Sequence, residues 1–444
     1  MTSPAQVQQS SFDKVEPQPT ATEWLRTKPD LVVYVPDNPE SPDNTNQHFN
    51  VVATPEGDFL ATWTTATMES CPDQRVVLSR STDRGRTWSE PEVLDGPEPE
   101  DPPGTGLASW QFLIVAPEIA PAGKTRIWCF YNKNVGVDDA RTADTGTLRG
   151  RYSDDGGQTW SANYHEYPIA PNSISNPDPS IPSTWIVYQN PVVTKERHVL
   201  AGFTRWASNA VDPGMGMFER HSEICFLRFE NILQEPDPER LIVTTWPRAP
   251  HGICVPNPNR PGRSTAQEPT AQTLSDGRLI SVFRTMQGRI FYSLSEDDGR
   301  SWDAPRVLRY SPGGEELRNP LAPCPLYKLC DGRFLLVFFN NDGSVHGGLG
   351  PTDSVNVRNP AFVTVGREIQ GETDHPIRFG SPKVFADTDW TPPYPGGKHT
   401  QVASYPSLLE DRGERILFYP DRKHFLLGKY LTDEWLDECD PGSL

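Results

Sequence analysis

Four side chains with useful chemistry stand in β-rich segments of this chain: His48, Glu268, Arg284 and Tyr405. Arginine presents a planar fork that binds a carboxylate through two parallel hydrogen bonds. Tyrosine becomes a usable nucleophile or base only when a carboxylate or cations adjust its proton affinity, and histidine titrates near neutral pH. Each residue also has a structural alternative: a cross-strand ion pair for Glu268 and Arg284, a core aromatic for Tyr405, and a backbone-bonded histidine for His48.

A repeated box indicates the elements that position these residues. The pattern Ser-x-Asp-x-Gly-x-Thr/Ser-Trp occurs three times, starting at Ser81, Ser153 and Ser295, and the second gap is about twice the first. Asp and Gly suit a tight turn, and the closing Trp covers a large apolar area beneath it. Short β-rich runs precede the boxes, so each copy predicts a strand, a turn and a second strand.

The box resembles the Asp-box, or BNR repeat, of the sialidase superfamily, whose members are β-propellers. The resemblance implies an all-β fold, a six-bladed β-propeller with seven blades as the alternative, in which the box forms the turn between the outer two strands of a blade. We expect the ring to be closed by pairing of Arg415–Tyr419 with Leu31–Tyr34, because closure removes exposed sheet edges. The expected blades lie near residues 45–100, 105–170, 180–245, 262–312, 318–370 and 378–432, and the third lacks the box.

Two segments resemble the parts of sialidases that carry the reaction. In Gln267–Arg284 a Glu opens one strand and an Arg ends the next, across an Asp-Gly turn, and Ala403–Leu408 is similar to the segment of the nucleophilic tyrosine. The resemblance implies that Tyr405 is the nucleophile and that Glu268 activates or orients it. It also implies that Arg284 is one of three arginines gripping a sugar carboxylate.

Two further positions match the family less closely. Arg358 is a weaker match to another of the three arginines, and a solvated surface position is its alternative. Glu69 and Asp73 lie on the loop where sialidases place their acid/base aspartate, although the spacing differs. Surface charge is the alternative for each carboxylate.

The first strand departs from the sialidase pattern. Sialidases carry an Arg-Ile-Pro there, whereas this chain has Gln47-His48 within Asn46–Gly57, so the first arginine is missing. A site with His, Tyr and Arg suits β-elimination at a uronic acid, which needs a base at C5, an acid for the leaving oxygen and cations for the carboxylate. Propeller polysaccharide lyases are similar in using histidine and tyrosine at the channel.

Three functions follow from these residues. The leading hypothesis is a carbohydrate-active enzyme that cleaves a glycosidic bond at an acidic sugar, a uronate, by lyase chemistry with His48 and Tyr405 transferring protons. The second is an exo-α-sialidase-like hydrolase with Tyr405, Glu268 and Glu69 or Asp73. The third is a non-catalytic propeller that binds a glycan or protein. Gln47 and further polar and aromatic residues near strand starts are expected to bind substrate, although core packing is the alternative for the aromatics: Trp110, Gln111, Tyr131, Asn190, Arg205, His221 and Arg422.

Composition limits the remaining possibilities. The 46 prolines and 34 glycines indicate many strands joined by irregular loops, which we divide into an N-terminal arm at 1–25 and a single domain at 26–444. A net charge of −18 argues against nucleic-acid and anionic-membrane partners. It does not exclude the acidic oligosaccharide or glycoconjugate that the resemblance implies as the substrate, because a local cluster of arginines can dominate a concave site. The seven cysteines form no CxxC pair, so we expect reduced thiols and neither a metal site nor a cofactor. The start of the sequence has no apolar signal segment, which predicts a cytoplasmic protein, or a secreted one if the numbering begins after processing.

Overall fold

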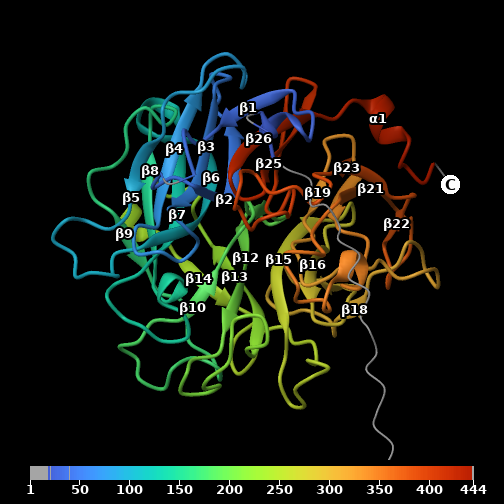
Figure 1. The fold of residues 1–444 in the computed structure, drawn as a ribbon. Coiled ribbons are helices and arrows are strands. Elements are labelled where there is room, and N and C mark those ends of the chain that lie inside the picture. Colours follow the sequence, from blue (N-terminus) through green and yellow to red (C-terminus); the bar gives the residue numbers. More distant parts are fainter. Residues whose placement is uncertain (1–18, 21, 40, 443–444) are drawn as a thin grey trace, which may run out of the picture.

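Six antiparallel sheets, arranged as blades around a central axis, form the protein in a computed structural model that describes residues 19–20, 22–39 and 41–442 (Figure 1). The six-bladed all-β propeller predicted from the sequence is confirmed. Because every blade packs between two others, its middle strands are buried on both faces; all eight residues of Phe59–Ala66 are buried.

The strands of the first three blades, given from the axis outward, are β2 (Thr45–Ala53), β3 (Phe59–Ala66), β4 (Arg75–Ser81) and β5 (Glu92–Asp95); β6 (Ala108–Ala120), β7 (Lys124–Lys133), β8 (Thr147–Ser153) and β9 (His165–Tyr167); β10 (Thr184–Ile186), β12 (Val199–Trp206), β13 (Ser222–Phe229) and β14 (Val243–Trp246), with β11 (Val192–Val193) also paired with β12. The other three blades are β15 (Ala266–Thr273), β16 (Leu279–Thr285), β17 (Ile290–Ser295) and β18 (Arg306–Val307); β19 (Leu326–Lys328), β20 (Phe334–Phe338), β21 (Ala361–Glu368) and β22 (Ile377–Phe379), with β23 (Lys383–Ala386) also paired with β21; β24 (Ser407–Asp411), β25 (Glu414–Asp421), β26 (Phe425–Tyr430) and β1 (Leu31–Tyr34). The short helices are η1 (Glu23–Leu25), η2 (Pro121–Gly123), η3 (Thr142–Asp144), η4 (Pro238–Arg240), η5 (Val345–Gly347) and α1 (Asp433–Asp437).

The ring closes through the last blade, where β1 from the N-terminal part pairs with β26 from the C-terminal part. Figure 1 shows the blue strand β1 beside the red strands β25 and β26. The prediction that Arg415–Tyr419 pairs with β1 was wrong by one strand. Arg415–Tyr419 lies in β25, and β26 stands between β25 and β1. Most of the expected arm at 1–25 lies outside the described residues, and its last turn, η1, contacts this blade through Glu23.

The three boxes occupy equivalent turns between the third and fourth strands of their blades. In the first box Asp83 accepts hydrogen bonds from the Thr87 amide at 2.8 Å and the Thr87 hydroxyl at 2.7 Å, and the Trp88 indole donates to the Gly85 carbonyl at 3.0 Å. Gly85 has a φ of 84°, which explains the glycine in the pattern. Because neighbouring strands in a blade are antiparallel, successive connections lie at opposite ends of the blade. The boxes, which follow third strands, therefore lie at the opposite end from the loops that join second and third strands.

Bulges on the innermost strands are the feature that positions the site. The strand registers of β2, β6 and β15 shift at Gln47/Asn50, Ser109/Phe112 and Gln267/Thr270. The residue inside each bulge has a left-handed backbone: φ is 58° at His48, 58° at Trp110 and 53° at Glu268. Tyr405, just before β24, has a φ of 69°. Strained bulges of this kind re-aim the side chains that they carry.

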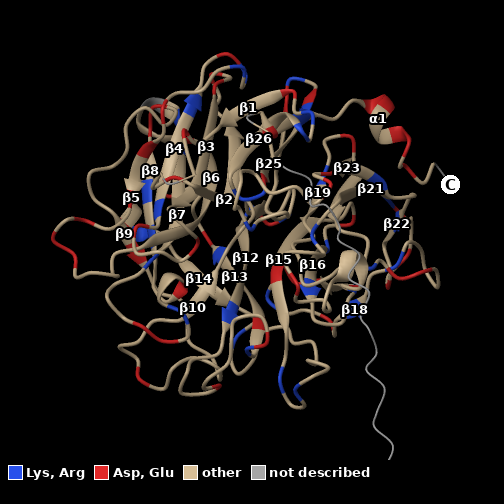
Figure 2. Cartoon of the chain, in the orientation of Figure 1, with Lys and Arg blue, Asp and Glu red and all other residues tan. Residues whose placement is uncertain are grey.

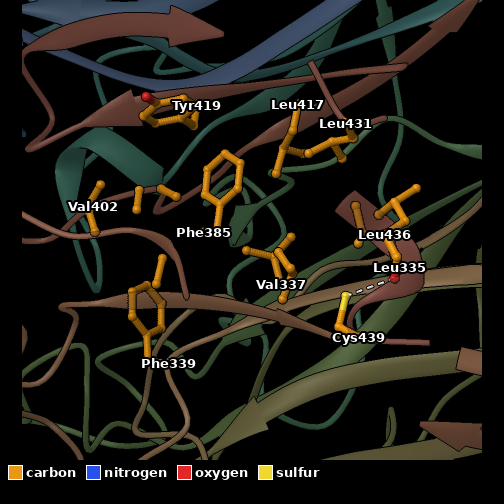
Figure 3. Packing of buried hydrophobic residues seen from close by; sticks show 14 of the residues in the cluster. Leu335, Val337, Phe339, Phe385, Val402, Leu417, Tyr419, Leu431, Leu436 and Cys439 are labelled. Carbon is orange, nitrogen blue, oxygen red and sulfur yellow. Dashed lines mark hydrogen bonds between the residues drawn. The ribbon is translucent and has the colours of Figure 1, made fainter. Parts of the chain in front are cut away.

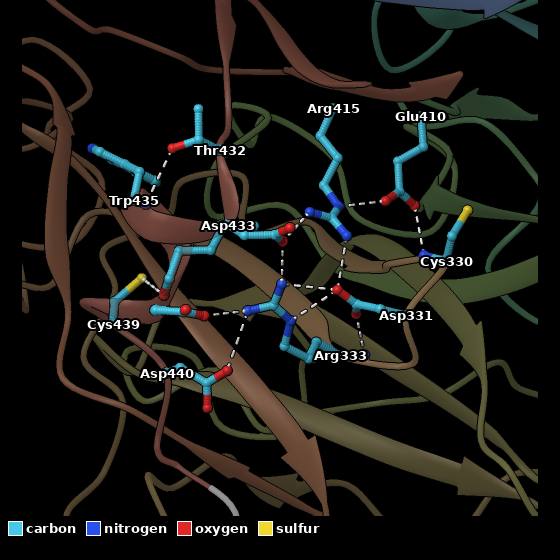
Figure 4. Close-up of polar contacts among 12 residues, drawn as sticks. Cys330, Asp331, Arg333, Glu410, Arg415, Thr432, Asp433, Trp435, Cys439 and Asp440 are labelled. Atoms are coloured by element: carbon cyan, nitrogen blue, oxygen red, sulfur yellow. Dashed lines mark hydrogen bonds and ion pairs between the residues drawn. The ribbon is translucent and has the colours of Figure 1, made fainter. Parts of the chain in front are cut away.

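The apolar cores lie between neighbouring blades. Figure 3 shows the largest cluster, where Leu335 and Val337 of β20 pack against Leu417 of β25 and Phe385 of β23. The C-terminal helix α1 covers this cluster and is held by an ion-pair network (Figure 4), in which Arg333 lies 2.9 Å from Asp433. Acidic and basic residues are interspersed around the outside of the ring (Figure 2). In the described part of the chain, no helix is long and apolar enough to cross a membrane.

Candidate active site

A pocket of about 320 Å³ lies where first strands begin, second strands end, and the loops between second and third strands meet. Pockets of about 400 to 540 Å³ lie elsewhere on the described surface. The smaller pocket gathers a buried tyrosine, two glutamates and four cations, so its chemistry rather than its size identifies it. Its lining comprises Glu69, Trp110, Arg141, Ile186, Trp206, Met217, Phe218, Glu268, Arg284, Ser354, Arg358, His399, Gln401, Tyr405 and Lys423.

Tyr405 and Glu268 form a direct pair in this pocket. The Tyr405 hydroxyl donates to Glu268 Oε1 at 2.9 Å, and both side chains are buried. The amide of Glu268 donates to the Thr204 hydroxyl of the neighbouring blade at 2.7 Å, which fixes the bulge that aims the carboxylate. Burial, followed by the charge of Glu268, raises the pKa of Tyr405 far above its usual value, so the phenol is protonated at neutral pH.

Arg284 lies on the other side of the same carboxylate. Its Nη1 is 2.7 Å from Glu268 Oε2, although the two groups are off hydrogen-bond alignment, and its Nε and Nη2 donate to Gln267 Oε1 at 3.2 and 2.9 Å. The sequence alternative of a cross-strand ion pair is therefore present, and it lies within the pocket. Structural pairing and a functional role coincide at this position.

Arg358 is a buried cation without a carboxylate partner among the ion pairs of the described residues. Its Nη2 donates to the Leu321 carbonyl at 2.5 Å, its Nε has no partner, and 3% of the residue is exposed. Burial lowers its pKa from the usual value. Because a buried charge is stabilised by pairing, this guanidinium favours an anionic ligand in the pocket. The surface alternative for Arg358 does not fit its burial.

Glu69 lines the same pocket and lies between two cations. Its carboxylate is 2.5 Å from Lys423 Nζ and 3.4 Å from Arg141 Nη2. Burial raises the pKa of Glu69, but Lys423 and Arg141 outweigh that effect and hold it well below its usual value. Asp73, the other acid/base candidate, accepts hydrogen bonds from Thr67 and does not line the pocket.

Aromatic side chains form the floor of the pocket. Trp110, Trp206 and Tyr405 pack with Ile186 and Tyr188 in one cluster. His48 lies beneath this floor: its ring stacks on Trp110 with centroids 3.4 Å apart, and none of the residue is exposed. Its Nδ1 is 3.1 Å from the Thr64 hydroxyl, and burial lowers its pKa well below the usual value. His48 therefore supports the tryptophan from below and does not reach the pocket surface.

The structure brings together six of the residues proposed from the sequence: Tyr405, Glu268, Glu69, Arg284, Arg358 and Trp110. The other nine do not line the pocket: Gln47, His48, Asp73, Gln111, Tyr131, Asn190, Arg205, His221 and Arg422. Gln111 is fully buried and accepts from Thr64, and Tyr131 donates to Asp95 at 2.6 Å between two blades.

The remaining candidates have structural partners of their own. Gln47 is buried in β2, and Asn190 lies 3.5 Å from the amide of Leu113. Arg205 donates to Ala170 and Ser175 beside a separate outer pocket. His221 contacts Glu223.

Arg422, expected to bind substrate, is instead fully enclosed between Glu23 and Asp421, at 2.9 and 2.8 Å. It joins η1 to the last blade. The adjacent Lys423 is the side chain that reaches the pocket.

Several pocket residues were not predicted from the sequence, chiefly Arg141, Lys423, His399 and Gln401. They lie on irregular loops with no motif of their own, and Lys423 has a φ of 52° that no sequence pattern indicates. Arg141 and Lys423 lie on loops that join second and third strands, whereas His399 and Gln401 lie on the connection that leads into β24. Burial lowers the pKa of His399 to about 4, so it is neutral at pH 7.

Metal-ligating side chains also gather in the described chain, but away from this pocket. The groups are His221, Glu223 and Cys254, and Glu196, His198 and Asp298. In the pocket itself, the carboxylates of Glu69 and Glu268 are already matched by Lys423, Arg141 and Arg284. This arrangement suits an anionic organic ligand rather than a metal ion.

Comparison with known proteins agrees with the fold. The family model described as a BNR repeat-like domain matches residues 57–416. None of the curated proteins matches this chain. Among solved structures, the fold is similar to the NanB sialidase from Streptococcus pneumoniae (TM-score 0.59, 13% identity, 92% of this chain and 71% of that one). It is also similar to the intramolecular trans-sialidase from Ruminococcus gnavus (TM-score 0.56, 14%, 91% and 97%) and to a Hadza microbial sialidase, Hz136 (TM-score 0.56, 15%, 89% and 67%).

Proposed function

The chain belongs to the BNR repeat-like domain family, within the sialidase superfamily, and we propose that it is an exo-acting glycoside hydrolase that releases a terminal carboxylate-bearing sugar. The observation that carries the proposal is the 2.9 Å hydrogen bond between Tyr405 and Glu268, in a pocket that also holds Arg358, a cation without a carboxylate partner among the described residues. The solved sialidases and trans-sialidases with this fold make a sialic acid the first substrate to test.

In this proposal Tyr405 is the nucleophile. Its oxygen bonds to the anomeric carbon while its proton passes to Glu268, so a neutral phenol attacks without first becoming a free phenolate. This matters because the pKa of Tyr405 is raised far above neutrality. The glycosidic bond breaks with its electron pair going to the leaving oxygen.

Glu69 is proposed to give that leaving oxygen its proton and later to accept one from the water that releases the sugar. Substitution occurs twice at the anomeric carbon, so the product keeps its configuration. Glu69 must be protonated for the first step, yet Lys423 and Arg141 lower its pKa. A substrate carboxylate that attracts these two cations would weaken their hold on Glu69 and favour its protonation.

Substrate binding is assigned to the cations and aromatic floor. Arg358, Arg284 and Lys423 line the same pocket. Lys423 supplies a positive charge in a chain that lacks the first-strand arginine of sialidases. The tryptophans Trp110 and Trp206 suit contact with the apolar face of a sugar ring.

The uronate lyase hypothesis is less well supported by these contacts. It requires His48 to remove a proton from the sugar, but His48 is fully buried under Trp110. A hydrolase yields a free sugar without a new chromophore, whereas a lyase yields an unsaturated uronate that absorbs in the far ultraviolet. The test is a panel of sialate- and uronate-capped oligosaccharides, read by product mass and absorbance. Free acidic sugar, lost in Tyr405→Phe, supports the proposal; an unsaturated product would overturn it.

A further inference from the structure

A second group of reactive side chains lies in the third blade, apart from the pocket. His221 and Glu223 stand at the start of β13, and His251 and Cys254 lie on the loop between β14 and β15. One ligand atom each from His221, Glu223 and Cys254 lies within 4.8 Å of the others. The sequence shows the two halves as a His-x-Glu pair and a His-x-x-Cys pair that only the fold brings together.

The carboxylate of Glu223 is buried without a Lys or Arg partner among the described residues. Its side chain is 0% exposed, and among the ion pairs of the described residues it meets only His221 and His251, with no Lys or Arg. Oε2 accepts from Asn172 at 2.7 Å and from the Gly252 amide at 2.8 Å. Buried carboxylates are otherwise paired with fixed cations or bound to metals.

The other carboxylate oxygen faces the metal-ligating atoms. Oε1 of Glu223 is 3.2 Å from His221 Nε2 and 3.0 Å from His251 Nδ1. In a tetrahedral zinc site with bonds of about 2.0 to 2.3 Å, neighbouring ligand atoms are separated by about 3.3 Å or slightly more. Both separations are close to that spacing, but His251 is outside the group of atoms that lie within 4.8 Å of one another, and its Nδ1 is also 2.9 Å from the Ser173 hydroxyl. Its side chain would have to turn to join the other three ligands.

Gly252 explains how the two halves come so close. The adjacent Ile253 exchanges hydrogen bonds with Ile224 of β13 at 3.0 and 2.9 Å. A Cβ on Gly252 would lie 2.3 Å from the Ile224 carbonyl oxygen, so only glycine lets the loop press against the strand. This contact holds Cys254 and His251 beside Glu223.

We propose that His221, Glu223, His251 and Cys254 form a Zn²⁺ site that fastens the loop between β14 and β15 to β13. Mixed nitrogen, oxygen and sulfur ligands suit zinc better than calcium or magnesium, which take oxygen ligands. The inference departs from the sequence expectation that the chain has no metal site, because the ligands form no recognisable spacing until the loop folds back.

The site also borders the pocket wall. The loop that ends at His221 carries Met217 and Phe218, which line the pocket, and the loop that carries Cys254 leads into β15 and Glu268. Zinc at this position would hold both loops at one point. Its role is structural, and it stands whether or not the proposed hydrolase activity is correct.

The second cluster, Glu196, His198 and Asp298, is a useful contrast. There Arg228 lies 2.8 Å from Asp298 and 2.7 Å from His198 Nδ1, so a guanidinium already supplies the positive charge. The same reasoning therefore predicts no zinc at that cluster.

The experiment uses the full chain without an affinity tag. Zinc is removed by chelator, restored as Zn²⁺ alone, and its stoichiometry and affinity are measured by elemental analysis and by competition with a chromophoric chelator. We expect about one tightly bound Zn²⁺ per chain, a higher unfolding temperature with zinc, and a thiolate-to-cobalt charge-transfer band when Co²⁺ replaces it. Cys254→Ser should abolish that band and weaken zinc binding by about 100-fold or more.

Two further variants keep the test decisive. His251 is 56% exposed at its side chain, so His251→Gln leaves the core intact and should still weaken zinc binding by about tenfold or more if Cys254→Ser fails to fold. His198→Gln is the matched control and should bind zinc like the parent. Absence of stoichiometric zinc in the parent, or equal binding in the parent and His251→Gln, would overturn the proposal.

Discussion

Replacing Glu268 with Gln removes the charge that Tyr405 and Arg284 share while keeping the shape of the side chain. The glutamine oxygen can still accept from Tyr405, whose hydroxyl lies 2.9 Å from Oε1. It cannot take the phenolic proton, and its amide faces Arg284 Nη1, 2.7 Å from the present Oε2. The substitution therefore separates proton transfer from simple positioning.

Two magnitudes follow from these contacts. Loss of a positioned proton acceptor is expected to lower kcat by about 10²- to 10⁴-fold, or about 2.7 to 5.5 kcal/mol of barrier. Loss of a hydrogen bond to a buried charged group is expected to lower the free energy of unfolding by about 1.5 to 3 kcal/mol. The variant should remain folded at 25 °C because this loss is smaller than the roughly 5 to 15 kcal/mol that stabilises a typical native protein.

The assay measures kcat on an aryl glycoside of the sugar that the substrate panel identifies, and the free energy of unfolding from urea titration. Asp73→Asn makes the same chemical change on a carboxylate outside the pocket and should alter kcat by no more than about twofold. A Glu268→Gln variant with the parent's kcat would refute the role given to the Tyr405 and Glu268 pair.

Further predictions concern binding, closure and pH. Arg358→Leu should raise KM for carboxylated substrates by about 10- to 100-fold while changing kcat less, because a charge-assisted bond is lost; an unchanged KM would exclude Arg358 from carboxylate binding. Arg422→Met should cost about 3 to 5 kcal/mol in urea unfolding because it leaves the buried carboxylate of Asp421 without its cation, and adding Asp421→Asn should recover part of that loss. Burial lowers the pKa of His424 to about 4, below its unfolded value near 6.5, so the unfolded chain binds more protons between these pH values. Stability should therefore fall as pH drops from about 6.5 to 4, and the fall should be smaller in His424→Gln; equal curves would contradict this cause.

The propeller could be predicted from the sequence because its signal is repeated and local. Each box contains its own hydrogen bonds, such as those between Asp83 and Thr87, so it forms the same turn wherever it occurs. The closing strand pair was less predictable: Arg415–Tyr419 and Phe425–Tyr430 are both apolar β-rich runs, and only the ring decides which of them meets β1.

The site could be predicted where one strand carries a recognisable segment. Glu268, Arg284 and Tyr405 were identified in this way, and all three meet in the pocket. His48 shows the limit of the method. It shares the bulge and the positive φ of Trp110 and Glu268, but its ring is covered by Trp110, and neither the stacking nor the burial is visible in the sequence.

Loop residues were missed for a different reason. Lys423 and Arg141 reach Glu69 from separate blades, at 2.5 and 3.4 Å, and no spacing along the chain indicates that contact. The sequence showed that the first-strand arginine is missing. It did not show that Lys423 and Arg141 add positive charge to the pocket, because both lie on loops whose positions only the fold determines.

The central claim is that Tyr405 attacks the sugar, and covalent trapping tests it most directly. A fluorinated glycosyl fluoride of the sugar identified by the panel would form a slowly hydrolysed adduct, which peptide mass spectrometry can locate. The account predicts one sugar bound to Tyr405 and none in Tyr405→Phe. An adduct on another residue, or turnover of the natural substrate to an unsaturated product, would contradict it.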